Sequence, residues 1–191
     1  MRVDGVVLAG GASRRFGSDK RNAMVGGRSL LELACHKMSA AVSGTVFVAG
    51  GRGGQVSAGG RVAVVDAVAG AGPLGGIVAG LLCSRADGLL VLACDMPNLR
   101  VSTLRSMAAL GTASARATAP RGSRGWEPLA AYYPRHTLQL LVAGLRDGVR
   151  APHLWLDRLG ALAVRGTSAW ELVNVNRPAD LARAGLAAAG E

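Results

Sequence analysis

Cysteine is scarce in this chain of 191 residues, which contains only Cys35, Cys83 and Cys94. The three form no Cys-x-x-Cys pair and their number is odd, so the sequence argues against a disulfide framework and against a zinc ribbon. The N-terminus carries Asp4 where an export signal would be apolar. We therefore expect the protein in the reducing environment of the cytoplasm.

Acidic and aromatic residues are few as well. The chain has 12 acidic and 22 basic residues, which gives a net charge of +10, and only Lys20 and Lys37 are lysines. Such a charge suits a nucleic-acid binder, a protein on an anionic membrane surface or an enzyme with polyphosphate substrates. Aromatic residues make up only 4% and the arginines are scattered, whereas a nucleic-acid surface interleaves basic and aromatic side chains. We therefore expect no nucleic-acid partner.

A long uncharged run at residues 67–84 approaches the length of a short membrane span. The run contains five glycines and a proline, which indicate a loop that enters a buried helix. We therefore expect no membrane partner.

Strand and helix patterns alternate along the chain. The predicted strands are residues 2–9, 45–49, 61–65, 88–94, 113–119, 128–133 and 172–175. The predicted helices are residues 29–42, 74–84, 101–110, 135–147, 153–159 and 178–189. Ser29 stands where a helix N-cap is expected. The alternation and the apolar strands predict one α/β domain, residues 1–191, around a mostly parallel sheet, with ligands bound beyond the carboxyl ends of the strands.

The loop after the first strand, residues 8–20, is rich in glycine and basic residues. Gly10 and Gly11 allow backbone N–H groups to approach an anion, and Arg15 and Lys20 supply positive charge. A surface turn with solvated charges is the alternative. The combination of two glycines with several basic residues directly after a strand favours phosphate binding. The spacing of a Walker loop is absent.

A second glycine motif, residues 70–75, fits Gly-x-Gly-x-x-Gly and precedes Asp95 by about twenty residues, as in dinucleotide-binding folds. The expected strand ends at Val65, too early for that motif, and Pro73 lies inside it. We prefer a tight loop whose backbone lies against a base or a sugar.

Two aspartates and two asparagines stand at predicted strand ends. Asp95 follows the most apolar strand and either caps a helix or binds Mg²⁺, and the phosphate loop at the same edge favours the metal. Asp66 either caps a turn or accepts N–H groups of a purine. Asn174 and Asn176 lie two residues apart, so a strand would direct both to one side, toward a substrate or metal-bound water. Their alternative role is to end a strand beside the last helix.

Four motifs together resemble the molybdenum cofactor guanylyltransferases (MobA), within the MobA-like NTP transferase superfamily. They are Leu-Ala-Gly-Gly…Asp-Lys at 8–20, Gly-Pro-Leu-x-Gly at 72–76, Cys-Asp-Met-Pro at 94–97 and Asn-x-Asn-x-Pro-x-Asp-Leu at 174–181. They occur in the family's order and span nearly the whole chain. Phe16 replaces the usual Met, Arg177 replaces Thr, and Gly50 or Gly51 stands near a position that is Asn in some members.

The resemblance implies a Rossmann-like three-layer sandwich of the nucleotide-diphospho-sugar transferase type. It implies transfer of GMP from GTP to the terminal phosphate of molybdopterin, with release of pyrophosphate. Charge neutralisation would come from Arg15 and Lys20, and Mg²⁺ would bind to Asp95. The expected GTP-binding residues are Leu8, Ala9, Gly10, Gly11, Lys20, Asp66 and Asp95. The candidates on the molybdopterin side are Asn174 and Asn176.

Three alternatives to guanylyl transfer accompany this expectation. The molybdenum cofactor cytidylyltransferases and other MobA-like nucleotidyltransferases are the nearest, although the three later motifs side with the guanylyl family. A non-catalytic nucleotide-binding regulator belongs to a different class. The partners implied are GTP, molybdopterin and proteins that deliver molybdopterin or receive the product as molybdoenzymes.

Overall fold

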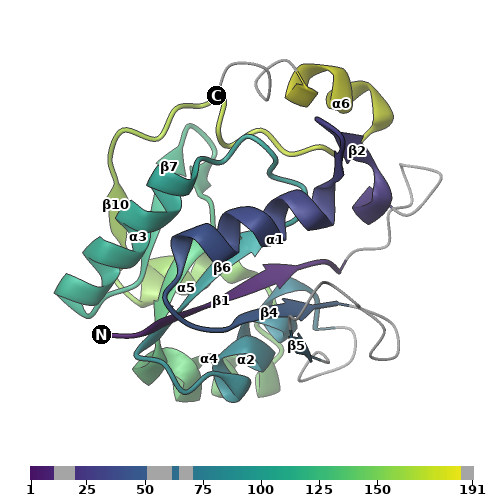
Figure 1. Ribbon diagram of the computed structural model, residues 1–191. Coiled ribbons are helices and arrows are strands. Elements are labelled where there is room, and N and C mark those ends of the chain that lie inside the picture. The colour runs from purple at the N-terminus through teal and green to yellow at the C-terminus, as the bar shows by residue number, and fades with distance from the viewer. Residues whose placement is uncertain (11–19, 51–61, 65–70, 186–191) are drawn as a thin grey trace.

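The computed structural model describes residues 1–10, 20–50, 62–64 and 71–185. A sheet in the order β10-β7-β9-β6-β1-β4-β5, with β8 paired to β7, forms the centre of the described part (Figure 1). The strands of this sheet are β1 (Val3–Leu8), β4 (Val46–Ala49), β5 (Val62–Val64), β6 (Gly88–Ala93), β7 (Thr118–Gly122), β8 (Gly125–Trp126), β9 (Ala130–Pro134) and β10 (Leu162–Val164). A separate pair consists of β2 (Met24–Val25) and β3 (Arg28–Ser29).

Four strand pairs of the sheet are parallel, and β9 runs antiparallel between β6 and β7. The predicted α/β fold with a mostly parallel sheet is therefore confirmed. The helices are α1 (Leu30–Ala41), α2 (Pro73–Cys83), α3 (Val101–Ser114), α4 (Leu138–Arg146), α5 (Pro152–Arg158) and α6 (Pro178–Gly185). Short 3₁₀ turns occupy Lys20–Asn22 and Arg135–Thr137.

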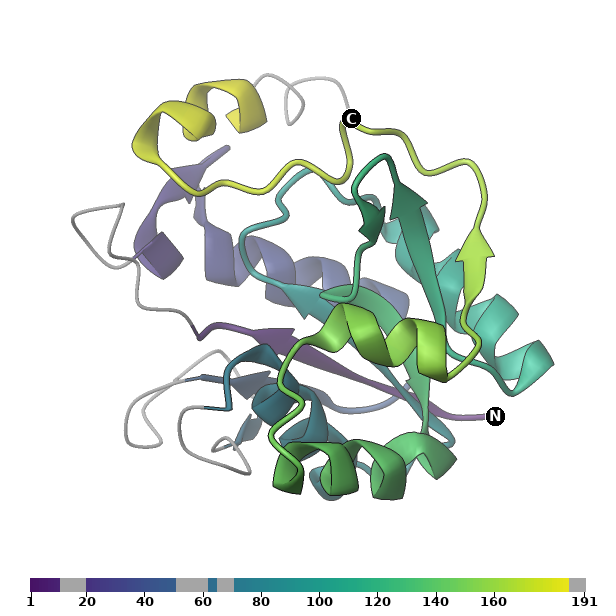
Figure 2. The ribbon, with the colours of Figure 1, turned by 180° about the vertical axis from the view of Figure 1, so that it is seen from behind.

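Helices cover both faces of the sheet, so the core has two halves (Figures 1 and 2). In β6, Leu89 and Val91 pack in the half that holds α2 and α4, while Leu90 and Leu92 pack in the half that holds α1 and α3. Alternate side chains of a strand point to opposite faces, which is why a strand buried on both sides is apolar throughout. The result is the expected three-layer sandwich.

Local sequence signals account for the start of α1 and of α2. Ser29 caps α1: its hydroxyl accepts the Glu32 backbone N–H, and the Glu32 carboxylate accepts the Ser29 N–H, which completes a capping box. The uncharged run at 67–84 contributes the eleven-residue helix α2, most of which is buried. Within the described ranges, no helix has both the length and the apolarity that a membrane crossing requires.

The strand predictions at 113–119 and at 172–175 were wrong. The strand predicted at 113–119 starts only at Thr118, because α3 continues to Ser114 and ends at Ala115 with a left-handed φ of 54°. Residues 172–175 form no strand, since the Val175 N–H donates to the Asp95 carbonyl at 2.8 Å instead of joining a ladder. The strands that were missed are β10, which pairs with β7 in parallel, and the two-residue strands β2, β3 and β8.

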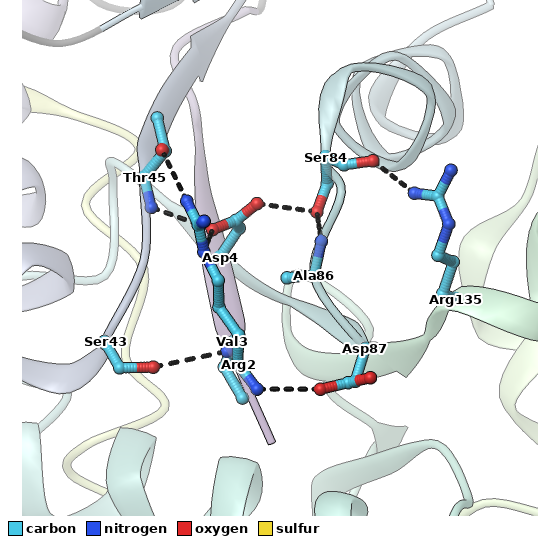
Figure 3. Close-up of polar contacts among 9 residues, drawn as sticks. All are labelled: Arg2, Val3, Asp4, Ser43, Thr45, Ser84, Ala86, Asp87 and Arg135. Carbon is cyan, nitrogen blue, oxygen red and sulfur yellow. Dashed lines mark hydrogen bonds and ion pairs between the residues drawn. The ribbon is translucent and has the colours of Figure 1, made fainter.

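Asp4 is a buried acidic residue near the start of β1, at the end of the strand away from Leu8, and its contacts are structural (Figure 3). Its carboxylate accepts the Thr45 backbone N–H at 2.8 Å and the Ser84 hydroxyl at 2.7 Å, and it pairs with Arg2. The contacts join β1, the entry to β4 and the end of α2. A buried carboxylate needs such donors, so Asp4 has a structural role.

Candidate active site

The carboxyl ends of β1, β4 and β6 lie side by side and form the floor of a pocket. The Ala9 N–H donates to the Ala49 carbonyl at 2.7 Å, and the Cys94 N–H donates to the Leu8 carbonyl at 3.1 Å. The pocket beyond these strand ends has a volume of about 170 Å³. Its lining includes Leu8, Gly10, Lys20, Gly50, Gly72 and Asp95. The parallel strands therefore bring sequence-predicted residues from distant motifs to one edge.

Lys20 and Asp95 face each other in this pocket. Lys20 Nζ lies 2.7 Å from Asp95 Oδ2, and the two side chains are only 18% and 17% exposed. Asp95 Oδ1 is buried and accepts no hydrogen bond from the described residues. An ionised carboxylate oxygen with no donor lacks compensation for its lost hydration. Asp95 can therefore accept one more cation or donor.

The two glycine loops approach the pocket through their backbones. Gly50 has φ +99°, and a Cβ at this position would collide with the Gly10 backbone. Gly72 has φ +65° and precedes α2, with Pro73 at the first helical position. Both glycines line the pocket, so a ligand there can contact bare backbone. The preferred interpretation of the second glycine motif, a tight loop against a ligand, stays a prediction.

The asparagine segment lies next to Asp95. The Val175 N–H bond to the Asp95 carbonyl joins the two motifs. Asn174 Oδ1 is buried and has no partner among the described residues, whereas Asn176 is exposed. Both asparagines line a second pocket of about 300 Å³. The N–H groups of Asn176 and Arg177 donate to Asp180 Oδ2 at 2.8 and 2.9 Å, so Asp180 stabilises the start of α6.

Two glutamates of this region were missed from the sequence. Glu171 is 1% exposed and accepts hydrogen bonds from Arg100 and Thr103 at 2.6 Å each. Glu127 lines the second pocket from the short loop between β8 and β9. Its position directly before the apolar stretch 128–133 was a usable signal. The sequence did not show, however, that β9 is antiparallel to β6, and this orientation is what brings the beginning of β9 to the carboxyl end of β6.

Cys94 is a packed residue, as expected. Burial, together with the negative charge of Asp95, raises the pKa of the Cys94 thiol to about 12. A thiol with this pKa remains protonated at neutral pH and is a poor nucleophile.

Among the described residues, no cluster of three or more His, Cys, Asp or Glu side chains could hold a metal ion. Gly11, Arg15 and Asp66 lie outside the described residues.

Comparison with known proteins gives a consistent picture. Residues 5–160 match the model of the protein family described as "MobA-like NTP transferase domain". A protein of Nostoc sp. named "Probable molybdenum cofactor guanylyltransferase" is 35% identical over 93% of this chain and 87% of its own length. The "Molybdenum cofactor guanylyltransferase" of Syntrophotalea carbinolica is 37% identical over 80% of this chain and 71% of its own.

Two solved structures illustrate the shared fold. The molybdopterin-guanine dinucleotide biosynthesis protein A of Archaeoglobus fulgidus superposes with a TM-score of 0.82 at 26% identity, over 98% of this chain and 100% of that one. The 2-C-methyl-D-erythritol 4-phosphate cytidylyltransferase of Thermus thermophilus gives a TM-score of 0.74 at 18% identity, over 96% and 98% of the two chains. The latter likeness concerns the fold alone.

Proposed function

The chain belongs to the MobA-like NTP transferase family, and we propose that it is a molybdenum cofactor guanylyltransferase. In the proposed reaction a terminal phosphate oxygen of Mo-molybdopterin attacks the α-phosphorus of GTP, the bond to the β-phosphate oxygen breaks, and pyrophosphate leaves. The observation that carries the proposal is the convergence of Lys20, Asp95 and the asparagine segment at one sheet edge, in a chain that matches guanylyltransferases over most of its length.

The nucleotide is proposed to occupy the first pocket. The residues that would contact GTP are Leu8, Ala9, Gly10, Gly11, Lys20, Asp66 and Asp95. Lys20 Nζ would neutralise phosphate oxygens as a compact charge, aided by Arg15, and stabilise the leaving pyrophosphate. Gly10 and Gly50 approach each other closely and both line this pocket, so a phosphate bound there would meet backbone rather than side chains at these two positions. Catalysis then consists of positioning and charge neutralisation, with no covalent enzyme intermediate.

A divalent metal, proposed to be Mg²⁺, fits the chemistry of Asp95. Asp95 Oδ1 is a buried carboxylate oxygen without a partner in the described part of the chain. Mg²⁺ commonly takes one or two protein carboxylates and completes its coordination with water and phosphate. A metal held by Asp95 would supply Lewis acidity and positive charge to the reacting phosphates. Lys20, which pairs with the other carboxylate oxygen, would hold Asp95 in place.

The second substrate is proposed to occupy the pocket lined by Asn174 and Asn176. The hydrogen bond from Val175 to the Asp95 carbonyl places this pocket beside the first one, as transfer between two bound substrates requires. We further propose that residues 1–191 form one catalytic domain. The three free cysteines are consistent with a location in the reducing cytoplasm. Proteins that deliver molybdopterin and molybdoenzymes that receive the product are the proposed protein partners.

A thermal-shift panel with GTP, CTP, ATP and NAD in the presence of Mg²⁺ tests the nucleotide. A ligand at 100 times its Kd stabilises the native state by about 2.7 kcal/mol. This free energy corresponds to a Tm increase of roughly 5–10 °C for a chain of this size. We expect such an increase with GTP alone. Selective stabilisation by CTP would assign the chain to the cytidylyl relatives, and NAD would revive the dinucleotide interpretation of residues 70–75. GTP-dependent pyrophosphate release on addition of Mo-molybdopterin then separates an enzyme from a nucleotide-binding regulator.

A further inference from the structure

The second pocket lies between the β7–β8 hairpin and the segment that leads from β10 to α6, which pass each other in Figure 2. The hairpin contributes Arg124 and Trp126, the loop between β8 and β9 contributes Glu127, and the later segment contributes Asn174. The Trp126 indole N–H donates to Asp157 Oδ1 at 2.6 Å, and Arg121 lies over the ring at 5.0 Å from its centre. The aromatic part of the lining is therefore fixed in orientation.

Glu127 is held at this pocket by its backbone, while its carboxylate has no donor in the part of the chain that the structure describes. The Glu127 N–H donates to the Pro120 carbonyl at 3.0 Å, and its own carbonyl accepts the Ala130 N–H at 3.2 Å. The side chain is half-buried, and no residue within the described ranges forms a hydrogen bond or ion pair with its carboxylate. Burial raises the pKa of Glu127, and the negative charge of Asp95 adds to this effect, although Arg124 partly offsets it.

A half-buried carboxylate that no described side chain engages is available to accept N–H donors or positive charge from a ligand. Two kinds of ligand are available in the proposed reaction: the metal bound with the nucleotide, and the ring system of the second substrate. Glu127 lines the second pocket with Asn174, whereas the nucleotide pocket is lined by Lys20 and Asp95. The position of Glu127 therefore favours the second substrate.

The chemistry of that substrate matches a carboxylate. The pyrimidinone ring of a pterin carries a 2-amino group and an adjacent ring N–H, which form two parallel donors along one edge. A carboxylate accepts two parallel N–H donors in the same way as it accepts the fork of a guanidinium. The fixed indole of Trp126 adds a flat apolar surface to the lining, which suits a bicyclic ring.

We propose that Glu127 is a specificity-determining residue for the second substrate and accepts the 2-amino and ring N–H donors of its pterin. This inference rests on the proposed function for the identity of the substrate. It assigns the pterin ring to Trp126 and Glu127 and leaves the terminal phosphate toward Asn174 and Asp95.

Binding of two simple bicyclic ligands tests the inference without GMP transfer. The probes are 6-hydroxymethylpterin and the corresponding lumazine, which has an oxo group in place of the 2-amino group, and both are titrated by their fluorescence. We expect wild type to bind the pterin on the order of 10-fold or more tightly than the lumazine, because a site built for a donor rejects the analogue that lacks it. The preference should disappear in Glu127→Ala and Glu127→Gln. Equal behaviour of the two ligands toward wild type, or a preference that persists in the variants, would overturn the inference.

Kinetics with Mo-molybdopterin provides the second measurement. Loss of charge-assisted hydrogen bonds should raise KM for Mo-molybdopterin roughly 10- to 100-fold in both variants. The affinity for Mg²⁺–GTP should stay within about twofold of wild type, a change too small to signify a lost bond. Asp147→Asn, which removes an exposed charge at the end of α4, is the matched control. An unchanged KM, or a comparable loss of Mg²⁺–GTP affinity, overturns the inference.

The two measurements also separate this inference from the proposed function. Wild type that distinguishes the two bicyclic ligands but transfers no GMP retains the pterin site and loses the guanylyltransferase assignment. Wild type that transfers GMP but treats the ligands alike retains the assignment and loses the role of Glu127. Melting temperatures of the variants complete the test: removal of an unpaired carboxylate should leave Tm equal or higher, and a large decrease would indicate a structural role instead.

Discussion

Replacement of Glu171 should weaken both the fold and the second-substrate site. The Glu171 side chain is 2% exposed and accepts Arg100 Nη2 and Thr103 Oγ1 at 2.6 Å, with further N–H bonds from Arg100 and Ser168 at 3.2 Å. These contacts tie the segment before Asn174 to the start of α3, just beyond the Asp95 loop. Glu171→Ala removes all of them and leaves the Arg100 guanidinium without this partner.

The size of the effect follows from the pKa of Glu171. Burial by itself raises this pKa, but hydrogen bonds from Arg100 and Thr103 outweigh burial and lower it from the ordinary 4.5 to about 2. A shift of this size corresponds to roughly 3 kcal/mol of stabilisation from ionisation. The Arg100 side chain is 50% exposed, so the cost of truncation should lie near the lower end of the roughly 3–5 kcal/mol that is typical of a fully buried ion pair. Glu171→Ala should therefore lower Tm by roughly 6–12 °C at pH 7.

The pH dependence distinguishes the charge from mere packing. The folded-state pKa is depressed, so the stabilisation is fully present above pH 4.5 and is lost as the pH falls through about 2. Thermal unfolding followed by circular dichroism should show a constant difference between wild type and Glu171→Gln from pH 7 to about pH 5. Below about pH 4.5 the difference should shrink. A Glu171→Ala cost under about 1 kcal/mol, or a Gln difference that stays constant to pH 2.5, would refute this reasoning.

Three further changes test the nucleotide side. Asp95→Asn should reduce the rate of pyrophosphate release at least about 100-fold, because it removes the proposed metal ligand, and should lower Tm because Lys20 loses its ion pair; near-normal turnover would exclude the metal-ligand role. Lys20→Ala should weaken GTP binding about 10- to 100-fold in a calorimetric titration, since a charge-assisted bond to phosphate is lost, and unchanged affinity would contradict phosphate binding by this loop. Gly50→Ala should lower both Tm and GTP affinity, because its Cβ would collide with Gly10. Gly27→Ala, at φ +79° in open space, is the control for backbone strain alone. Equal decreases of Tm and GTP affinity in the two variants would contradict a specific effect of the Gly50–Gly10 contact.

Most of the fold was predictable because its signals are local. The capping box of Ser29 and Glu32 is visible as a Ser-x-x-Glu spacing, and the buried strand β6 is visible as an uninterrupted apolar run. The short strand β10 was missed because three residues carry too little periodicity, and pairing with β7 is what makes them a strand. The strand predicted at 172–175 was wrong because a contact distant in the sequence decides its structure. The Val175 N–H donates to the Asp95 carbonyl, 80 residues earlier, and not to a neighbouring strand.

Parallel strands made only part of the candidate site predictable, since Asn174 and Asn176 were selected by their spacing and lie outside any strand. Lys20 and Asp95 stand in loops after β1 and β6, so the rule that ligands bind at carboxyl ends selects them. Glu127 follows no parallel strand and reaches the same edge because β9 is antiparallel. The position of Glu171 is set by hydrogen bonds from Arg100 and Thr103. These residues lie far from Glu171 in the sequence, so the contact could not be predicted.

The loop 95–100 explains why the rare lysines matter more than the abundant arginines. Lys20 holds the Asp95 carboxylate, and Lys37 on α1 donates to the Pro97 and Leu99 carbonyls at 2.6 and 2.9 Å. Glu171 binds the far end of the loop, at Arg100. An enzyme that works by positioning loses about 100-fold in rate when a reacting group moves by 1 Å. Charges from three separate elements therefore fix one short loop, and this preorganisation would allow the single carboxylate of Asp95 to act as the proposed metal ligand at the edge of the sheet.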